Sequence, residues 1–234
     1  MRILGVLVFA LVLVGPASAG GDWDRGRVLF VEGCSSCHGL DTRGVPDRGP
    51  LLESAGKAAV DFYLSTGRMP LDDPRDEPER AEPAYSRAEI EDLLAYLERP
   101  VRGGPVVPDV DSARGNESEG LRLFTDNCAA CHQVVGRGGV VPPGFSPQLQ
   151  DATAVQIAEA VRVGPWVMPA FDREQISDRE LDSLVRYVIS TRHPESPGGW
   201  GLFHIGPVPE GMVAWLIGLA ALLVVIRLLG KRMR

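Results

Sequence analysis

The chain has few of the residues that bind metals or fill aromatic cores. Its 234 residues include four cysteines, four histidines and five methionines, and aromatic residues make up 6% of the total. A chain of this length forms either two small domains of about 80 residues or one ordinary domain. With so few aromatic side chains, a protein-only core would be thin in a domain of about 80 residues. A buried apolar group would supply the apolar volume that the side chains lack.

A positive net charge is also absent, since the formal net charge is −7. Residues 20–226 combine 19 of the 24 basic residues with all 31 acidic ones, and so carry a net charge of −12. This acidic body argues against binding to nucleic acid. It suits a partner with a basic patch, and equally a soluble acidic surface with no specific partner. The other five basic residues lie at the ends of the chain, as Arg2, Arg227, Lys231, Arg232 and Arg234.

All four cysteines lie in two copies of one motif. Residues 34–38 (CSSCH) and 128–132 (CAACH) both read CxxCH, the attachment sequence for c-type haem. A zinc or dithiol site is the alternative, but zinc would need two more ligands near each pair, and the histidines are too few to serve both. The motifs therefore predict two covalently bound haem c groups. The predicted attachment residues are Cys34, Cys37, Cys128 and Cys131, and the predicted iron ligands are His38 and His132.

Two methionines are candidates for the second axial ligand of each iron. Outside the terminal segments the chain has only Met69 and Met168, and each is followed by proline. Methionine usually fills a core, but one methionine per half, in the same loop, favours ligation. A thioether stabilises Fe(II) and raises the reduction potential. It also completes the coordination of the iron, so the pattern predicts electron transfer rather than chemistry at the metal.

The surroundings of the two motifs form an internal repeat. Each half reads as helix, haem motif, loop, helix, methionine loop and amphipathic helix. A glycine eight residues before each first cysteine permits close approach of another helix. A backbone carbonyl is the usual acceptor for the second ring nitrogen of a ligand histidine, and we expect Pro50 and Pro147 to supply it. The matching pairs include Gly26 and Gly120, Phe30 and Phe124, the capping boxes at Ser86 and Ser177, and Tyr96 and Tyr187.

The two ends of the chain are apolar. Residues 1–19 combine an early arginine, a short apolar run and small residues, which predicts a secretory signal, although a retained anchor is the alternative. Residues 210–230 are long and apolar enough to span a membrane, and basic residues follow them. By the positive-inside rule the C-terminus is cytoplasmic. A buried helix of a soluble protein is the alternative, and the basic tail argues against it.

Each half resembles a class I cytochrome c, which implies an all-α protein with two tandem class I cytochrome c domains, and the apolar C-terminal segment adds one transmembrane helix. The expected location is the cell membrane, crossed once, with the haem domains on the extracytoplasmic side. The expected segments are a signal peptide (1–19), cytochrome c domain 1 (20–102), a linker (103–116), cytochrome c domain 2 (117–194), a second linker (195–209), the transmembrane helix (210–230) and a cytoplasmic tail (231–234).

Nearly the full chain resembles the dihaem cytochrome c subunit of the actinobacterial cytochrome bc1 complex, a menaquinol–cytochrome c reductase. The resemblance includes residues 44–50 (GVPDRGP), 65–70 (STGRMP), 164–171 and 206–212 (GPVPEGM), the last leading into the apolar helix. It implies an electron carrier without its own substrate site, acting as a subunit of a translocating reductase. The implied partners are a cytochrome b subunit, a Rieske iron–sulfur subunit that donates electrons, and an aa3-type oxidase that receives them.

Two other functions are compatible with parts of the pattern. A membrane-anchored dihaem cytochrome serving another oxidase or dehydrogenase would carry the same motifs. Co-purification with a cytochrome b and a Rieske protein distinguishes this possibility from the reductase subunit. A haem sensor or peroxidase would need an open coordination position, which Met69 and Met168 argue against.

Overall fold

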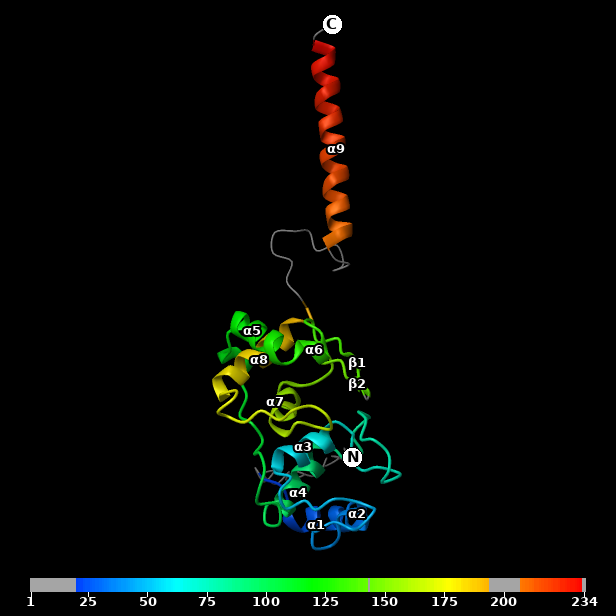
Figure 1. Ribbon diagram of the computed structural model, residues 1–234, viewed down its shortest axis with the longest axis vertical. Helices are drawn as coiled ribbons and strands as arrows, with labels where there is room; N and C mark the ends of the chain where they lie inside the picture. The colour runs from blue at the N-terminus through cyan, green and yellow to red at the C-terminus, as the bar shows by residue number, and fades with distance from the viewer. Residues whose placement is uncertain (1–19, 143, 194–206, 233–234) are drawn as a thin grey trace, which may run out of the picture. The chain divides into compact units, whose positions relative to one another are not determined.

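The computed structural model describes residues 20–142, 144–193 and 207–232 (Figure 1). The predicted signal at 1–19 lies outside the described residues, as does most of the predicted second linker. The helices are α1 (Trp23–Gly33), α2 (Ser35–His38), α3 (Lys57–Ser65), α4 (Arg87–Leu97), the 3-10 helix η1 (Ser112–Arg114), α5 (Glu117–Asn127), α6 (Ala129–His132), α7 (Ala154–Val163), α8 (Asp178–Ser190) and α9 (Pro207–Arg232).

The protein is mostly helical, as predicted, with one short hairpin that the sequence did not predict. Strand β1 (Gly139–Val141) pairs antiparallel with β2 (Gly144–Ser146), with Gly139 opposite Ser146. The first half has one isolated bridge, Val45 to Gly49, at the matching place. Three more residues separate His132 from Pro147 than His38 from Pro50, 15 against 12. The longer loop of the second half therefore extends a single bridge into a ladder.

The described residues form two compact units. Unit 1 takes in the described residues up to Asp109 together with Val155–Ile176, and unit 2 takes in Val110–Ala154 and the described residues from Ser177 onward. Helix α7 thus belongs to unit 1, although it follows the second CxxCH motif in sequence. The core of unit 1 contains a cluster of buried side chains contributed by α1, α3, α4 and the segment after α4: Phe30, Leu64, Ile90, Leu93, Leu97 and Val101.

A close helix crossing is the main packing feature of each unit. In unit 1, α1 lies against α4, and in unit 2, α5 lies against α8 (Figure 1). A Cβ atom on Gly26 would lie 1.9 Å from the Asp92 carbonyl oxygen, and one on Gly120 would lie 2.0 Å from that of Ser183. Only glycine allows this approach, as expected from the repeat. A tilted ring pair stands beside each crossing, Phe30 with Tyr96 at 5.3 Å and Phe124 with Tyr187 at 5.5 Å.

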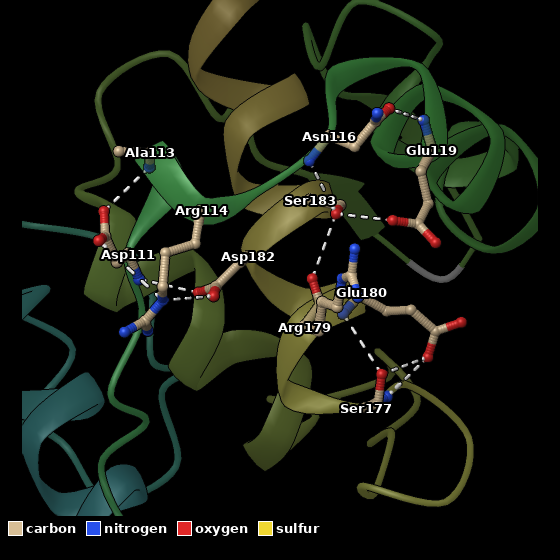
Figure 2. A network of polar contacts seen from close by, with 10 residues as sticks. All are labelled: Asp111, Ala113, Arg114, Asn116, Glu119, Ser177, Arg179, Glu180, Asp182 and Ser183. Carbon is tan, nitrogen blue, oxygen red and sulfur yellow. Dashed lines mark hydrogen bonds and ion pairs between the residues drawn. The ribbon is translucent and has the colours of Figure 1, made fainter.

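The ends of the crossing helices are fixed by matching hydrogen bonds. Both predicted capping boxes are present, at the starts of α4 and α8. One side chain of α4 and one of α8 also accept a hydrogen bond from the residue that caps the N-terminus of the facing helix, α1 or α5. The Asp22 amide donates to Asp92 Oδ1 at 2.6 Å, and the Asn116 amide donates to Ser183 Oγ at 3.0 Å (Figure 2). The second half therefore repeats the first at the level of single contacts.

The predicted linker at 103–116 is hydrogen bonded on both sides of the boundary between the units. In unit 1, the Gly103 amide donates to the Glu53 carbonyl at 3.0 Å, and the Ala58 amide donates to the Pro105 carbonyl at 3.0 Å. In unit 2, Asp182 of α8 accepts from the Asp111 amide at 2.8 Å and from Arg114 at 3.0 Å (Figure 2). These contacts restrain a segment that its glycine and proline content alone marks as flexible.

The last helix, α9, has the length and composition of a membrane span. The candidate span is Val208–Lys231, 24 residues long. In the 18-residue apolar window that defines this span, no residue is buried against the rest of the described protein. A helix of this length exceeds the roughly 30 Å of hydrocarbon in a bilayer. By these measures α9 fits a membrane anchor, as the sequence predicts.

Candidate haem-binding sites

The first CxxCH motif is wound into a single helical turn directly after α1. The Cys37 and His38 amides donate to the Cys34 carbonyl at 3.2 and 3.0 Å. Residues three and four apart on a helix share a face, so the backbone places both cysteines and the histidine on one side of the turn. This is the arrangement that attachment of one planar group by two thiols and one imidazole requires.

The second motif has the same backbone. The Cys131 and His132 amides donate to the Cys128 carbonyl at 3.1 and 2.9 Å. Burial, and then the charge of the second cysteine of each pair, raise the pKa of Cys34 and of Cys128 to about 11. At neutral pH both thiols are therefore protonated in the unmodified polypeptide. Within the described parts of the chain, no three His, Cys, Asp or Glu side chains are grouped to hold a metal ion.

The ring of His38 is oriented by the carbonyl that the sequence predicted. His38 Nδ1 lies 2.8 Å from the Pro50 carbonyl oxygen. A carbonyl can only accept a hydrogen bond, so Nδ1 carries a proton, and the neutral form of the ring has its lone pair on Nε2. The ring therefore presents the nitrogen that a metal binds, as is usual for ligand histidines.

His132 has the predicted carbonyl and a second partner that the prediction missed. Its Nδ1 lies 3.2 Å from the Pro147 carbonyl oxygen and 2.7 Å from Ser146 Oγ. The ring is 8% exposed. Burial lowers the pKa of His132, against a smaller opposing effect of the Pro147 hydrogen bond, which favours the neutral form that binds metal. The only sequence signal for the serine was the contrast between Ser146-Pro147 and Gly49-Pro50.

Met69 lies beside the first motif in unit 1. Its side chain packs against the buried cluster around Phe30 and Leu64, and Cys34 packs against the same cluster. The Met69 amide donates to the Tyr63 carbonyl at 3.1 Å, which fixes the loop after α3. The structure thus brings Met69 and Cys34 of the first predicted site to one apolar cluster.

Met168 lies in the loop after α7, within unit 1. Its amide donates to the Pro165 carbonyl at 3.1 Å. Arg162 of α7 holds the following segment, because its Nη1 donates to the carbonyls of Phe171, Asp172 and Ile176 at 2.7–3.0 Å. Cys128, Cys131 and His132 belong to unit 2, so the pairing of Met168 with His132 stays a prediction.

A half-buried guanidinium next to Met69 in sequence provides a further test of whether haem fits the first site. Arg68 Nη1 is buried and has no hydrogen-bond partner among the described residues. Its guanidinium carbon lies 4.9 Å from the centre of the Phe62 ring. Burial lowers the pKa of Arg68, and the positive charge of Arg80 lowers it further. Such a cation favours an acidic partner, and the propionates of haem are acidic groups of that kind.

Both halves match family descriptions of cytochrome c domains. Residues 23–99 match the family described as cytochrome c, and residues 115–188 match cytochrome c oxidase, cbb3-type, subunit III. With a CxxCH turn in each half, the protein is a c-type cytochrome with two cytochrome c domains. Domains of this class bind haem c covalently.

Relatives define the family more narrowly. The chain is 39% identical over 219 residues to the "Cytochrome bc1 complex cytochrome c subunit" of Mycobacterium tuberculosis, covering 90% of this chain and 78% of the relative. It is 35% identical over 225 residues to the protein of the same name from Corynebacterium diphtheriae, covering 89% and 80%. The chain belongs to the family of cytochrome c subunits of the cytochrome bc1 complex and carries electrons as a cytochrome c.

A more distant relative is the cbb3-type cytochrome c oxidase subunit CcoP of Azospirillum. It is 28% identical over 200 residues, covering 75% of this chain and 62% of that protein. Among solved structures, cytochrome c4 from Pseudomonas stutzeri aligns at a TM-score of 0.26 and 22% identity, over 72% of this chain and 98% of that one.

Proposed function

We propose that the chain binds two haem c groups and relays electrons through both. The first haem is attached at Cys34 and Cys37, with His38 and Met69 as iron ligands. The second is attached at Cys128 and Cys131, with His132 and Met168. The observation that carries this proposal is the repeated turn in which a proline carbonyl holds the Nδ1 proton of each histidine.

We further propose that the chain receives electrons from a Rieske iron–sulfur subunit and passes them towards an aa3-type oxidase. Its family is that of bc1 complex subunits, so a cytochrome b and a Rieske protein are the expected neighbours. The basic residues after α9 favour a cytoplasmic C-terminus. The two haem domains then lie on the extracytoplasmic side, where α9 keeps them near their partners and raises their effective concentration.

The chain's own residues bind and orient the haem groups rather than catalyse a reaction. When bound, haem supplies a one-electron Fe(III)/Fe(II) couple, whose potential depends on its ligands and on the dielectric around it. Pro50 and Pro147 fix the tautomer of each histidine. The cluster around Phe30 provides an apolar wall behind Cys34 and Met69. Arg68 supplies positive charge beside Met69.

Purification of the intact chain from its native membrane tests the proposal. We expect a mass that exceeds the polypeptide by two haem groups, and co-purification with a cytochrome b and a Rieske protein. Quinol should reduce both haems in this preparation. The reduced protein should fail to bind carbon monoxide, since methionine occupies the sixth position. One haem per chain, or rapid carbon monoxide binding, would contradict the proposed ligand set.

A second candidate function follows from the second half. Its match to the cbb3-type oxidase subunit III family and the distant similarity to CcoP favour a cytochrome that delivers electrons directly to an oxidase of another type. The same purification separates the two candidates. Recovery with an oxidase, but without a cytochrome b or a Rieske protein, would favour this alternative.

A further inference from the structure

Ser146 distinguishes the second predicted haem site from the first. Its hydroxyl oxygen lies 2.7 Å from His132 Nδ1, closer than the Pro147 carbonyl oxygen at 3.2 Å. At the first site, His38 Nδ1 has the Pro50 carbonyl at 2.8 Å. The residue before Pro50 is Gly49, which has no side chain to offer. The two histidines therefore differ in the number of acceptors around one ring nitrogen.

The position of Ser146 follows from the hairpin. Ser146 ends β2, where it pairs with Gly139. The adjacent Gly138 donates its amide hydrogen to the His132 carbonyl at 3.0 Å. A Cβ on Gly138 would lie 2.2 Å from the Ser146 carbonyl oxygen, and Gly138 has a φ of +70°. The hairpin thus brings Ser146 back against the helical turn that carries His132.

The first site has no room for such a serine. A Cβ on Gly49 would lie 2.7 Å from the Cys37 carbonyl oxygen and 3.0 Å from Cys37 Cβ. Both atoms belong to the haem-attachment turn and cannot move away without displacing it. The three additional residues of the second loop allow a side chain at the equivalent position. The difference between the sites is therefore built into the backbone.

The protonation of His132 fixes the direction of the serine hydrogen bond. The Pro147 carbonyl can only accept, so the proton that it binds is on Nδ1. The Ser146 oxygen then accepts from the same N–H. A ligand histidine whose N–H is bound more strongly becomes a more basic, electron-rich ligand. Such a ligand stabilises Fe(III) relative to Fe(II) and lowers the reduction potential.

We infer that Ser146 is a positioning residue that sets the reduction potential of the second haem through His132. The inference rests on the proposed function, because it takes His132 as an iron ligand. Loss of the hydroxyl leaves His132 with the longer Pro147 hydrogen bond. The potential of the second haem then rises, while the first haem is unaffected.

The test is a redox titration of the intact, haem-loaded chain with Ser146→Ala. At a fixed solution potential, the ratio of reduced to oxidised second haem should rise roughly fivefold, the scale of one hydrogen bond. Ser146→Thr retains the hydroxyl and should restore the original titration. Ser146→Gly reproduces the first site and should behave like the alanine variant. The first haem, titrated in the same sample, is the internal control.

Two readouts keep failure of this inference separate from failure of the proposed function. The charge-transfer band of methionine–iron ligation and the covalent haem content should stay unchanged in every Ser146 variant. If both are unchanged and the second haem titrates as before or at a lower potential in Ser146→Ala, the inference is wrong and the proposed function stands. If the unaltered chain lacks a haem at Cys128 and Cys131, the proposed function itself fails.

Discussion

The two CxxCH turns share one backbone frame but differ in what surrounds their histidines. Each turn makes the same amide bonds to its first cysteine, and each histidine is bound by a proline carbonyl. His38 is partly exposed and has that one acceptor, whereas His132 is 8% exposed and has a serine as well. The duplicated frame thus keeps both predicted attachment turns alike, while a three-residue difference in one loop changes the polar surroundings of the predicted ligand His132.

The strongest test of the shared frame is removal of one attachment pair at a time. Replacing Cys34 and Cys37 with alanine should abolish covalent haem at the first site only, and halve the haem content of the chain. Replacing Cys128 and Cys131 should do the same at the second site. Each turn is built on its own helix crossing, so the other should remain intact. Absorbance per chain after denaturation measures the content, and loss of both haems from either variant would show that the sites are not independent.

The predicted axial methionines are the next comparison. Met69→His and Met168→His should each keep covalent haem while lowering the potential of one haem. Imidazole favours Fe(III) relative to a thioether, and the shift should be a substantial part of the roughly 0.8 V over which axial ligands tune haem. Met212→Leu, in the apolar helix α9, is the control and should leave both potentials unchanged. A potential that does not move removes that methionine from the ligand set.

A substitution that separates the helices at either crossing should destabilise its own unit to the same extent. Gly26→Ala and Gly120→Ala each place a Cβ about 2 Å from a carbonyl oxygen of the facing helix, so the helices must separate. We expect each to lower the free energy of unfolding of its own unit by about 3 kcal/mol. Gly139→Ala is the control, since its Cβ would meet only the flexible end of Gln133, at 3.2 Å. Denaturant titrations measure the free energy of unfolding of all three variants. Unequal losses for Gly26→Ala and Gly120→Ala would show that one crossing is packed less tightly than the other.

A buried carboxyl group breaks the similarity of the two middle helices. Counting back from Gly67 and Gly164, α3 buries Phe62 where α7 buries Glu159, which is 0% exposed. No donor reaches the Glu159 carboxyl oxygens among the described residues. Asp61 of α3 is its neighbour and is paired with Arg87 at 2.5 Å. Burial, and then the charge of Asp61, raise the pKa of Glu159 to about 9, so at neutral pH Glu159 is protonated beside the Asp61 carboxylate.

This carboxyl group makes stability depend on pH in a defined direction. In the unfolded chain the pKa of Glu159 has the ordinary glutamate value of 4.5, whereas in the folded protein the carboxyl holds its proton up to a pH of about 9. Between these values the folded state binds the extra proton, so its stability falls as pH rises, by about 1.4 kcal/mol per pH unit. Glu159→Gln should flatten this dependence, whereas Glu53→Gln, at an exposed position, should not. Unfolding free energies at several pH values between 5 and 9 measure it, and parallel curves for Glu159→Gln and the unaltered chain would contradict the assignment.

Local sequence patterns predicted most of the helical frame. The amphipathic pattern at the end of each half predicted α4 and α8, and the glycine before each motif identified the crossing. Each of these signals comes from residues that are close together in sequence, and each occurs once in both halves of the internal repeat. The two proline carbonyls were also predictable, because proline keeps its acceptor and ligand histidines need one.

The features that the sequence did not predict all depend on contacts between distant segments. Ser146 meets His132 only because the intervening residues form a hairpin. Glu159 lies beside Asp61 only because α7 meets α3, where Gln156 Nε2 donates to the Ser65 carbonyl at 3.0 Å, although the two helices lie far apart in sequence. Arg68 is unusual only because its buried Nη1 has no hydrogen-bond partner among the described residues. Glu159 and Arg68 do not differ in type or spacing from ordinary solvated side chains. The only signal for Ser146 is that it stands before proline where the first half has glycine.

The smallest expected effect is at the helix caps, where the two halves are most alike. Ser86 Oγ accepts from the Glu89 amide at 3.4 Å, and Ser177 Oγ accepts from the Glu180 amide at 3.3 Å. In each box the serine amide donates to the glutamate carboxylate at 2.9 Å. Ser86→Ala and Ser177→Ala should each lower the free energy of unfolding by about 1 kcal/mol. Ser86→Asp and Ser177→Asp, which keep a capping oxygen, should recover most of it. Because α4 and α8 carry the contacts that fix α1 and α5, unequal losses in denaturant titrations would show that one half depends more on its last helix than the other.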